Sequence, residues 1–260
     1  MIDVHCHILP VDDGAKDFEE AIEMAKIAEK DGIKIIINTS HFNDDFDYIR
    51  GKQIKTELET FNNMLKENNI NVKVMLGNEL YYNESLMAHI QKRTVDFYTL
   101  ANSNYVLLEF CPGMFPKRID DIVYEFTVRG YRVILAHIER YKEIQQDITI
   151  LNDAINEGAY VQINASSILK KSPKHINEFC DKLLKEKKVH IVSSDAHGSK
   201  NRRPILSEAY DFVLNEYGRD NAEILFNENP LKIINNEKMV SLKNYKKEKI
   251  NFLMKLIGKR

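Results

Sequence analysis

The stretch Asp31-Gly32-Ile33-Lys34-Ile35-Ile36-Ile37 joins the end of an expected helix to a strand that is apolar at almost every position. A strand of that composition is typical of a parallel sheet buried on both faces. Glycine directly before the strand is the usual left-handed helix terminator. The same junction recurs at Arg129-Gly130-Tyr131 and at Glu157-Gly158-Ala159. The sequence therefore predicts a repeating β/α fold.

Amphipathic helical segments separate the strands, and the clearest is 17–30, where Phe18, Ile22 and Ala25 share a face. Seven β/α units without an internal linker predict one α/β domain over residues 1–242, a closed seven-stranded parallel β/α barrel. A doubly wound open sheet is the alternative, although no phosphate-cradling glycine motif follows the first strand. The expected strands are 2–7, 33–39, 72–77, 105–110, 131–136, 160–164 and 189–193.

Composition is that of an ordinary globular protein, with 43% hydrophobic and 29% charged residues. No run approaches the roughly 20 apolar residues that span a bilayer. We expect no signal peptide, because no basic region followed by an apolar run opens the chain. Cys6, Cys111 and Cys180 are few, odd in number and far apart, so we expect reduced thiols in a cytoplasmic protein.

Charge is unevenly distributed along the chain. Residues 243–260 hold six Lys and one Arg against one Glu, so this segment carries +6 and leaves −8 for the remainder of a net −2. A body that acidic is a poor partner for nucleic acid. In the basic tail, Ile250, Leu253, Met254 and Ile257 share one helical face, which is typical of a helix that contacts an anionic membrane or an acidic protein surface. A helix docked on the barrel, or a frayed end, is the alternative.

Chemistry-bearing residues follow the strands. The i, i+2 spacing of His5 and His7 puts both imidazoles on one face of a strand and Cys6 on the other. Every later strand is followed by a histidine or a carboxylate, except the sixth, which ends in Gln162 and Asn164. In a β/α barrel these positions meet at one mouth. The expected set is His5, His7, Asp12 or Asp13, His41, Glu79, Glu109, His137, Asp195 and His197.

Carboxylates gathered in one pocket repel one another and lose solvation, so a shared cation is the simplest explanation. Imidazole and carboxylate donors without thiolates suit Mn²⁺, Fe or Zn²⁺. Arg140, and either Arg202 or Arg203, follow two of the strands, and guanidinium groups beside a metal mouth are suited to gripping phosphate. The sequence thus predicts a polynuclear metal site that handles a phosphoryl group.

At this point the motifs match a known family. The chain resembles the PHP (polymerase and histidinol phosphatase) superfamily and, within it, the manganese-dependent protein-tyrosine phosphatases of Gram-positive capsule and exopolysaccharide clusters. The resemblance runs from residue 1 to about 235 and rests on the opening 1–15, on Ala136-His137-Ile138-Glu139-Arg140 and on Ser193-Ser194-Asp195-Ala196-His197.

This resemblance implies a distorted seven-stranded β/α barrel that holds three metals, with Mn²⁺ as the expected ion. It assigns His5, His7, Glu79 and Asp195 to one metal, Glu79, Glu109 and His137 to a second, and Asp13, His41 and His197 to a third. Asp13 is preferred to Asp12 because it directly precedes Gly14. The same resemblance assigns Arg140 and Arg202 to the phosphate.

The implied reaction is hydrolysis of protein phosphotyrosine by a metal-bound hydroxide, with the tyrosine-rich tail of a cognate bacterial tyrosine kinase as substrate. Two alternatives are a PHP phosphatase for a small phosphomonoester such as histidinol phosphate, and a metal-stabilised docking module without activity. Tyr81-Tyr82 and the loop 112–116 form either an aromatic rim for phosphotyrosine or simple packing. Thiolate catalysis is not expected, since the arginine it requires at the sixth position after a cysteine is absent in all three cases.

Overall fold

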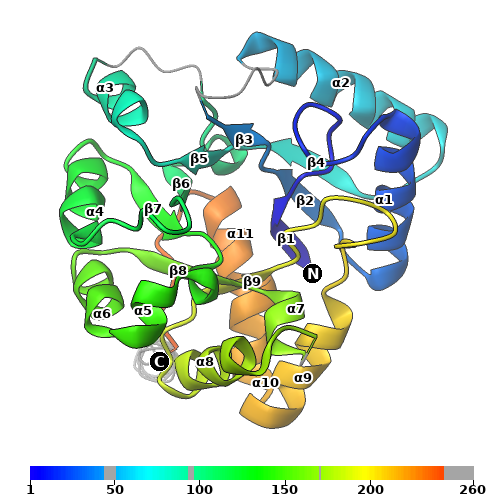
Figure 1. The fold of residues 1–260 in the computed structure, drawn as a ribbon. Helices are drawn as coiled ribbons and strands as arrows, with labels where there is room; N and C mark the ends of the chain where they lie inside the picture. Colours follow the sequence, from blue (N-terminus) through cyan, green and yellow to red (C-terminus); the bar gives the residue numbers. More distant parts are fainter. Residues whose placement is uncertain (44–50, 93–96, 170, 243–260) are drawn as a thin grey trace, which may run out of the picture.

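The computed structural model describes residues 1–43, 51–92, 97–169 and 171–242 (Figure 1). All seven expected strands are present, and two short strands, β3 and β5, continue the courses of β2 and β4. The strands are β1 (Ile2–Cys6), β2 (Ile35–Asn38), β3 (His41–Phe42), β4 (Lys73–Leu76), β5 (Glu79–Tyr81), β6 (Tyr105–Glu109), β7 (Arg132–Leu135), β8 (Tyr160–Asn164) and β9 (Ile191–Ser193).

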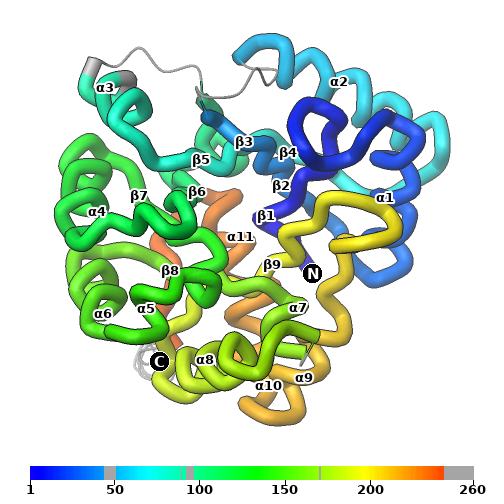
Figure 2. Tube along the Cα trace, viewed as in Figure 1, coloured from blue at the N-terminus to red at the C-terminus, as the bar shows by residue number. Residues whose placement is uncertain are grey.

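Neighbouring strands pair in parallel throughout the described residues, which confirms the α/β class. Their order is β1-β2-β4 in one sheet and β3-β5-β6-β7-β8-β9 in another. β1 lies beside the segment that follows β9 (Figure 2), where His7 N donates to Ala196 O at 2.8 Å and Asp195 N donates to His5 O at 2.8 Å. The single closed seven-stranded barrel is not confirmed, because β2 and β4 are interrupted and their continuations pair in the other sheet.

Most helices lie outside the strands, whereas α11 lies behind the middle of the ring of strands (Figure 1). In α1, the Asp17 side chain caps the first turn by accepting from Glu20 N at 2.8 Å. Gly32, Gly130 and Gly158 adopt φ values of 89°, 90° and 109°, so the predicted helix terminators are confirmed. The helices are α1 (Phe18–Asp31), α2 (Lys52–Glu67), α3 (Glu84–Lys92), α4 (Ile119–Thr127), α5 (Lys142–Gln146), α6 (Thr149–Asn156), α7 (Ala165–Ile168), α8 (Lys174–Lys185), α9 (Ser207–Tyr217), α10 (Arg219–Glu223) and α11 (Asn229–Ile234), with short turns η1 (Leu100–Asn102), η2 (Ile138–Arg140) and η3 (Ile224–Glu228).

Apolar side chains fill the space enclosed by the strands. Val4, Leu107 and Ile134 are buried there together with Ile233, which comes from α11. A second apolar layer separates the strands from the outer helices and includes Phe126 and Leu183. Burial of each large apolar side chain stabilises the fold by roughly 1.5–3 kcal/mol. The buried imidazoles and carboxylates of the expected site, which include His5, Glu79, His137 and Asp195, lie at or near the carboxyl ends of the strands.

The sequence predicts no membrane-spanning segment, a basic helix in the tail and a domain boundary at residue 242. Within the described parts of the chain, no helix is long and apolar enough to cross a bilayer. The basic tail, 243–260, lies outside the described residues, so its helix and the domain boundary at residue 242 stay predictions.

Candidate metal centre

β1 delivers the first two imidazoles. Its pairing with β2 shifts in register between Asp3 and Cys6, the mark of a β-bulge, which commonly re-aims side chains beside active sites. The Nε2 atoms of His5 and His7 lie 3.3 Å apart, so the two rings share a face as predicted. Cys6 is fully buried in the outer apolar layer, which agrees with its predicted opposite orientation.

Glu79, at the start of β5, is the centre of the cluster. Its Oε2 atom lies 3.2 Å from Nε2 of both His5 and His7. The same oxygen lies 3.4 Å from His41 Nδ1, and Oε1 lies 2.9 Å from His137 Nε2. Burial opposes ionisation, but the surrounding imidazoles hold the pKa of Glu79 well below its usual range. A carboxylate with both oxygens committed in this way is suited to bridging two cations.

All nine expected donors meet in this one region, and four subsets have ligand atoms within 4.8 Å of one another. The assignment of these residues to three separate metals stays a prediction. The subsets are His7, Asp13, His41 and His197; His5, Glu79 and His137; His5, His7 and Asp195; and His41, Glu79 and Glu109.

The polar atoms of the cluster fit a bound cation. Asp195 Oδ1 is buried without a hydrogen-bond partner among the described residues, yet it lies 3.4 Å from His5 Nε2 and 3.6 Å from His197 Nδ1. A buried carboxylate oxygen faced by imidazole nitrogens is the arrangement that a shared metal ion satisfies. Although burial opposes protonation, Glu109 and Glu79 raise the pKa of His137 to about 10. The cluster therefore favours positive charge at its centre.

Asp12 and Asp13 have different places in the structure. The Asp12 carboxylate is buried, lies 2.9 Å from His7 Nδ1 and accepts from His41 N at 2.8 Å. Asp13 is half exposed, and its Oδ1 atom lies 3.5 Å from Nε2 of both His41 and His197. Asp12 thus orients a donor imidazole through its far nitrogen, whereas Asp13 is one of the nine donors.

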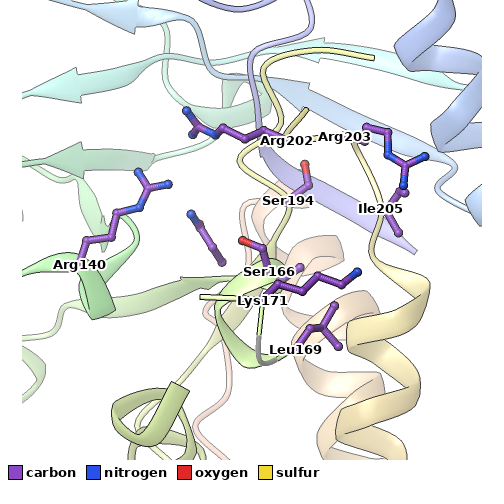
Figure 3. Close-up of a pocket in the computed structure, with 10 residues that line it drawn as sticks. Arg140, Ser166, Leu169, Lys171, Ser194, Arg202, Arg203 and Ile205 are labelled. Atoms are coloured by element: carbon purple, nitrogen blue, oxygen red, sulfur yellow. The ribbon is translucent and has the colours of Figure 1, made fainter. Parts of the chain in front are cut away.

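Two arginines border the cluster. Arg140 Nη2 and Arg202 Nη2 lie 2.8 Å and 2.7 Å from Asp195 Oδ2. Both side chains are nearly half exposed, so their guanidinium groups face the cluster on one side and solvent on the other. Among the described residues Arg203 makes no ion pair, and its guanidinium lies away from those of Arg140 and Arg202 (Figure 3). Of the two candidates from the sequence, Arg202 is the one beside the donors.

Gln162 and Asn164, at the end of β8, were noted in the sequence but were not assigned a role in the site. Gln162 Oε1 accepts from His137 N at 2.7 Å and lies 3.2 Å from His5 Nδ1. Gln162 Nε2 donates to Asn164 Oδ1 at 2.8 Å, and Asn164 Nδ2 donates to Asp195 Oδ2 at 2.8 Å. The sequence pattern that could have identified them is their i, i+2 spacing at the end of an apolar strand. The same spacing predicted that the two histidines of β1 share a face.

The cysteines do not suit thiolate chemistry. Burial raises the pKa of the Cys6 and Cys180 thiols well above the usual range. Cys111 is half-buried, and its thiol lies 3.6 Å from Pro112 O. No cysteine is therefore a member of the donor cluster or of a phosphate-cradling loop within the described residues.

Of the two alternatives for Tyr81-Tyr82 and the loop 112–116, the ring contacts of Tyr82 and Phe115 favour packing. Tyr82 and Phe115 are partly buried, and each ring contacts Phe110, with centroids 5.6 Å and 5.2 Å away. Phe115 also contacts Tyr141, whose ring centroid lies 6.0 Å from that of His137. These rings form an apolar wall that ends beside the donor cluster.

Comparison with known proteins places the chain in a family of capsular polysaccharide synthesis proteins. The family model described as "Capsular polysaccharide synthesis, CpsB/CapC" matches residues 1–235. Tyrosine-protein phosphatase CpsB of Streptococcus agalactiae serotype III (strain NEM316) is 31% identical over 242 residues, which cover 91% of this chain and 99% of that protein. Tyrosine-protein phosphatase YwqE of Bacillus subtilis (strain 168) is 32% identical over 233 residues, or 86% of this chain and 91% of the relative.

A solved structure gives the same result. It comes from a study of YwqE from Bacillus subtilis and CpsB from Streptococcus pneumoniae, described as metal-dependent tyrosine phosphatases. The TM-score is 0.87 at 30% identity, covering 93% of this chain and 97% of the other. These matches confirm the resemblance drawn from the sequence motifs.

Proposed function

Because this chain belongs to the CpsB/CapC family of capsular polysaccharide synthesis proteins, we propose that it is a metal-dependent protein-tyrosine phosphatase. The observation that carries the proposal is the convergence of nine imidazole and carboxylate donors bordered by Arg140 and Arg202. Two relatives that align over most of this chain are named tyrosine-protein phosphatases. We propose as well that β2 with β3, and β4 with β5, each act as one interrupted strand of the distorted seven-stranded barrel expected from the sequence; the order of strands in the two sheets supports this.

The donors divide into three metal sites in this proposal, with Glu79 shared between two of them. Mn²⁺ is the ion we favour, because the family resemblance implies it; mixed nitrogen and oxygen donors without thiolates also suit Fe and Zn²⁺. Bound ions supply Lewis acidity toward the phosphoryl oxygens and lower the pKa of the attacking water. The sites, as the family resemblance implies them, are His5, His7, Glu79 and Asp195; Glu79, Glu109 and His137; and Asp13, His41 and His197.

The arginines bind and orient the phosphate. Arg140 and Arg202 each present a guanidinium to the same Asp195 oxygen, so both are held at the boundary between the donor cluster and solvent. A phosphoryl group entering there meets two planar donors that match its oxygens and stabilise charge in the transition state. Phenolate, with a pKa near about 10, leaves more easily than an alkoxide, so a strong general acid is not required.

The substrate and the cellular location in this proposal are taken from the resemblance to the family. We take the substrate to be a tyrosine-phosphorylated protein in capsule synthesis, specifically the C-terminal tail of a bacterial tyrosine kinase in the cytoplasm. The basic tail, 243–260, would bring the enzyme to an anionic membrane surface. Deletion of residues 243–260 should then reduce binding to anionic vesicles, and unchanged binding would remove the membrane contact from the proposal.

The decisive experiment combines metal analysis with an activity assay. Purified protein is analysed for bound metals, treated with a chelator, and assayed on a phosphotyrosine peptide before and after addition of Mn²⁺, Fe²⁺ or Zn²⁺. Activity should be lost on chelation and restored most fully by Mn²⁺. Full activity of the metal-free protein would overturn the mechanism. A faster rate on histidinol phosphate than on the peptide would favour the small-phosphomonoester alternative instead.

A further inference from the structure

A cavity of about 310 Å³ adjoins the donor cluster, and Arg140 and Arg202 line its near side (Figure 3). Arg203 and Lys171 also line it, and no carboxylate is among the described residues of its lining. In Figure 3 the guanidinium groups of Arg140 and Arg202 lie to one side of Ser194. The guanidinium group of Arg203 and the amine of Lys171 lie to the other side. The volume is at the lower end of the roughly 300–1,000 Å³ typical of small-ligand pockets.

The loop after β9 sends two consecutive arginines in different directions. Arg202 has φ 47°, a left-handed conformation that turns the chain sharply. Backbone hydrogen bonds from His197 N to Arg202 O and from Ile205 N to Arg203 O, each 2.9 Å, fix the turn. Arg202 consequently reaches Asp195, and Arg203 is left exposed across the cavity.

The far side of the cavity keeps excess positive charge. Three of the cations that line the cavity form ion pairs with described residues. Arg140 and Arg202 pair with Asp195, and Lys171 pairs with Glu208, with Lys171 Nζ 2.5 Å from Glu208 Oε2. Lys171 and Glu208 are both half exposed, so their pairing is screened by water and weak. Arg203 has no acidic partner within 1–43, 51–92, 97–169 and 171–242.

The geometry points to a subsite on this far side for a second anionic group of the substrate. This inference rests on the proposed function, because it takes Arg140 and Arg202 as the clamp for the phosphate that is removed. A phosphate held there would leave Arg203 and Lys171 facing the residues next to the phosphotyrosine. Arg203, which makes no ion pair among the described residues, and Lys171, whose exposed pair with Glu208 is weak, attract a carboxylate or a phosphate on those residues. The enzyme therefore prefers phosphotyrosine in an acidic or multiply phosphorylated segment over phosphotyrosine in a neutral one.

Three matched phosphotyrosine peptides test this preference. They differ only in the residues on either side of the phosphotyrosine, which are glutamine, glutamate or phosphoserine. We expect kcat/KM to be about five- to tenfold higher for the anionic peptides than for the glutamine peptide, mostly through KM, since exposed ion pairs contribute modestly. The glutamate and phosphoserine arms tell whether a carboxylate, a phosphate or either group occupies the subsite. Equal kcat/KM on all three peptides would overturn the subsite and leave the phosphatase assignment intact.

Single substitutions test whether Arg203 and Lys171 cause the preference for anionic peptides. In Arg203→Gln, and in Lys171→Gln, the ratio of kcat/KM between anionic and neutral peptides should fall toward one. Arg219→Gln, which removes the same charge from the exposed start of α10, is the matched control and should keep the wild-type ratio. Salt supplies a measurement that does not depend on any variant, because raising it from about 0.05 M to about 0.5 M should reduce the wild-type ratio. A ratio that survives both Arg203→Gln and Lys171→Gln contradicts the proposal, whereas hydrolysis of none of the peptides by wild type would reject the phosphatase function itself.

Discussion

Replacement of Gln162 by leucine tests whether hydrogen bonds to Gln162 orient the metal-donor residues His5 and His137. Gln162 is fully buried and nearly the same size as leucine, so the change removes polar atoms rather than volume. Since His137 N–H donates to Gln162 Oε1, that atom is the amide oxygen, and it accepts the proton of His5 Nδ1 as well. The proton on Nδ1 leaves His5 Nε2 with its lone pair toward Glu79 and Asp195, where a metal needs it.

Three hydrogen bonds disappear in Gln162→Leu, two that Gln162 accepts and one that it donates to Asn164. A buried group left without its partner costs about 1–3 kcal/mol, so the free energy of unfolding should fall by at least about 3 kcal/mol. Loss of a residue that orients a metal ligand usually weakens metal binding about 10–100-fold. We therefore expect the Mn²⁺ concentration for half-maximal activity to rise by about that factor.

The assay is a Mn²⁺ titration of chelator-treated protein, followed by calorimetry and by phosphatase activity. Circular dichroism and urea unfolding establish that the variant is folded under assay conditions. Gln53→Leu, on the exposed face of α2, is the matched control and should leave both curves unchanged. An unaltered Mn²⁺ affinity in folded Gln162→Leu would refute the reasoning, because His5 would then be oriented by something else.

Three further results are expected. Cys111→Ser should keep turnover within about twofold of wild type, because no thiolate takes part; a large loss would contradict metal-only chemistry. Asp13→Asn should lower the number of bound Mn²⁺ ions counted by mass spectrometry, whereas Asp12→Asn should weaken their affinity without changing the number; identical stoichiometry in both would be evidence against the separate roles. His190 Nδ1 accepts from Val161 N, and burial lowers the pKa of His190 to about 4. The unfolded chain, with a histidine pKa near about 6.5, therefore takes up this proton first as pH falls, and stability should drop by up to about 3 kcal/mol between pH 6.5 and 4. His190→Asn, which keeps an acceptor but does not titrate, should lose less over that range in urea unfolding, and an equal loss would be inconsistent with the assignment.

Sequence periodicity predicted the parts of the site that lie on regular strands. The i, i+2 spacing was enough to place His5 and His7 on one face, and the polar residue after each apolar strand was enough to collect the nine donors. Closure of the barrel could not be predicted this way. Interruptions between β2 and β3 and between β4 and β5 depend on hydrogen bonds between distant strands, which leave no mark on local hydrophobic pattern.

Sequence by itself determined the α/β class through the local alternation of side chains, the family through the resemblance of its motifs, and the candidate donors through residue types that suit metal chemistry. The residue pattern left two choices between neighbours in the chain open, the family resemblance favoured one neighbour in each pair, and the tertiary structure shows where each of them lies. Asp12 lies behind His7 while Asp13 faces His41, and Arg202 reaches Asp195 while Arg203 lines the cavity. One position along the backbone reverses the direction of a side chain, and which direction reaches the cluster depends on turns fixed by hydrogen bonds to residues far away in the sequence.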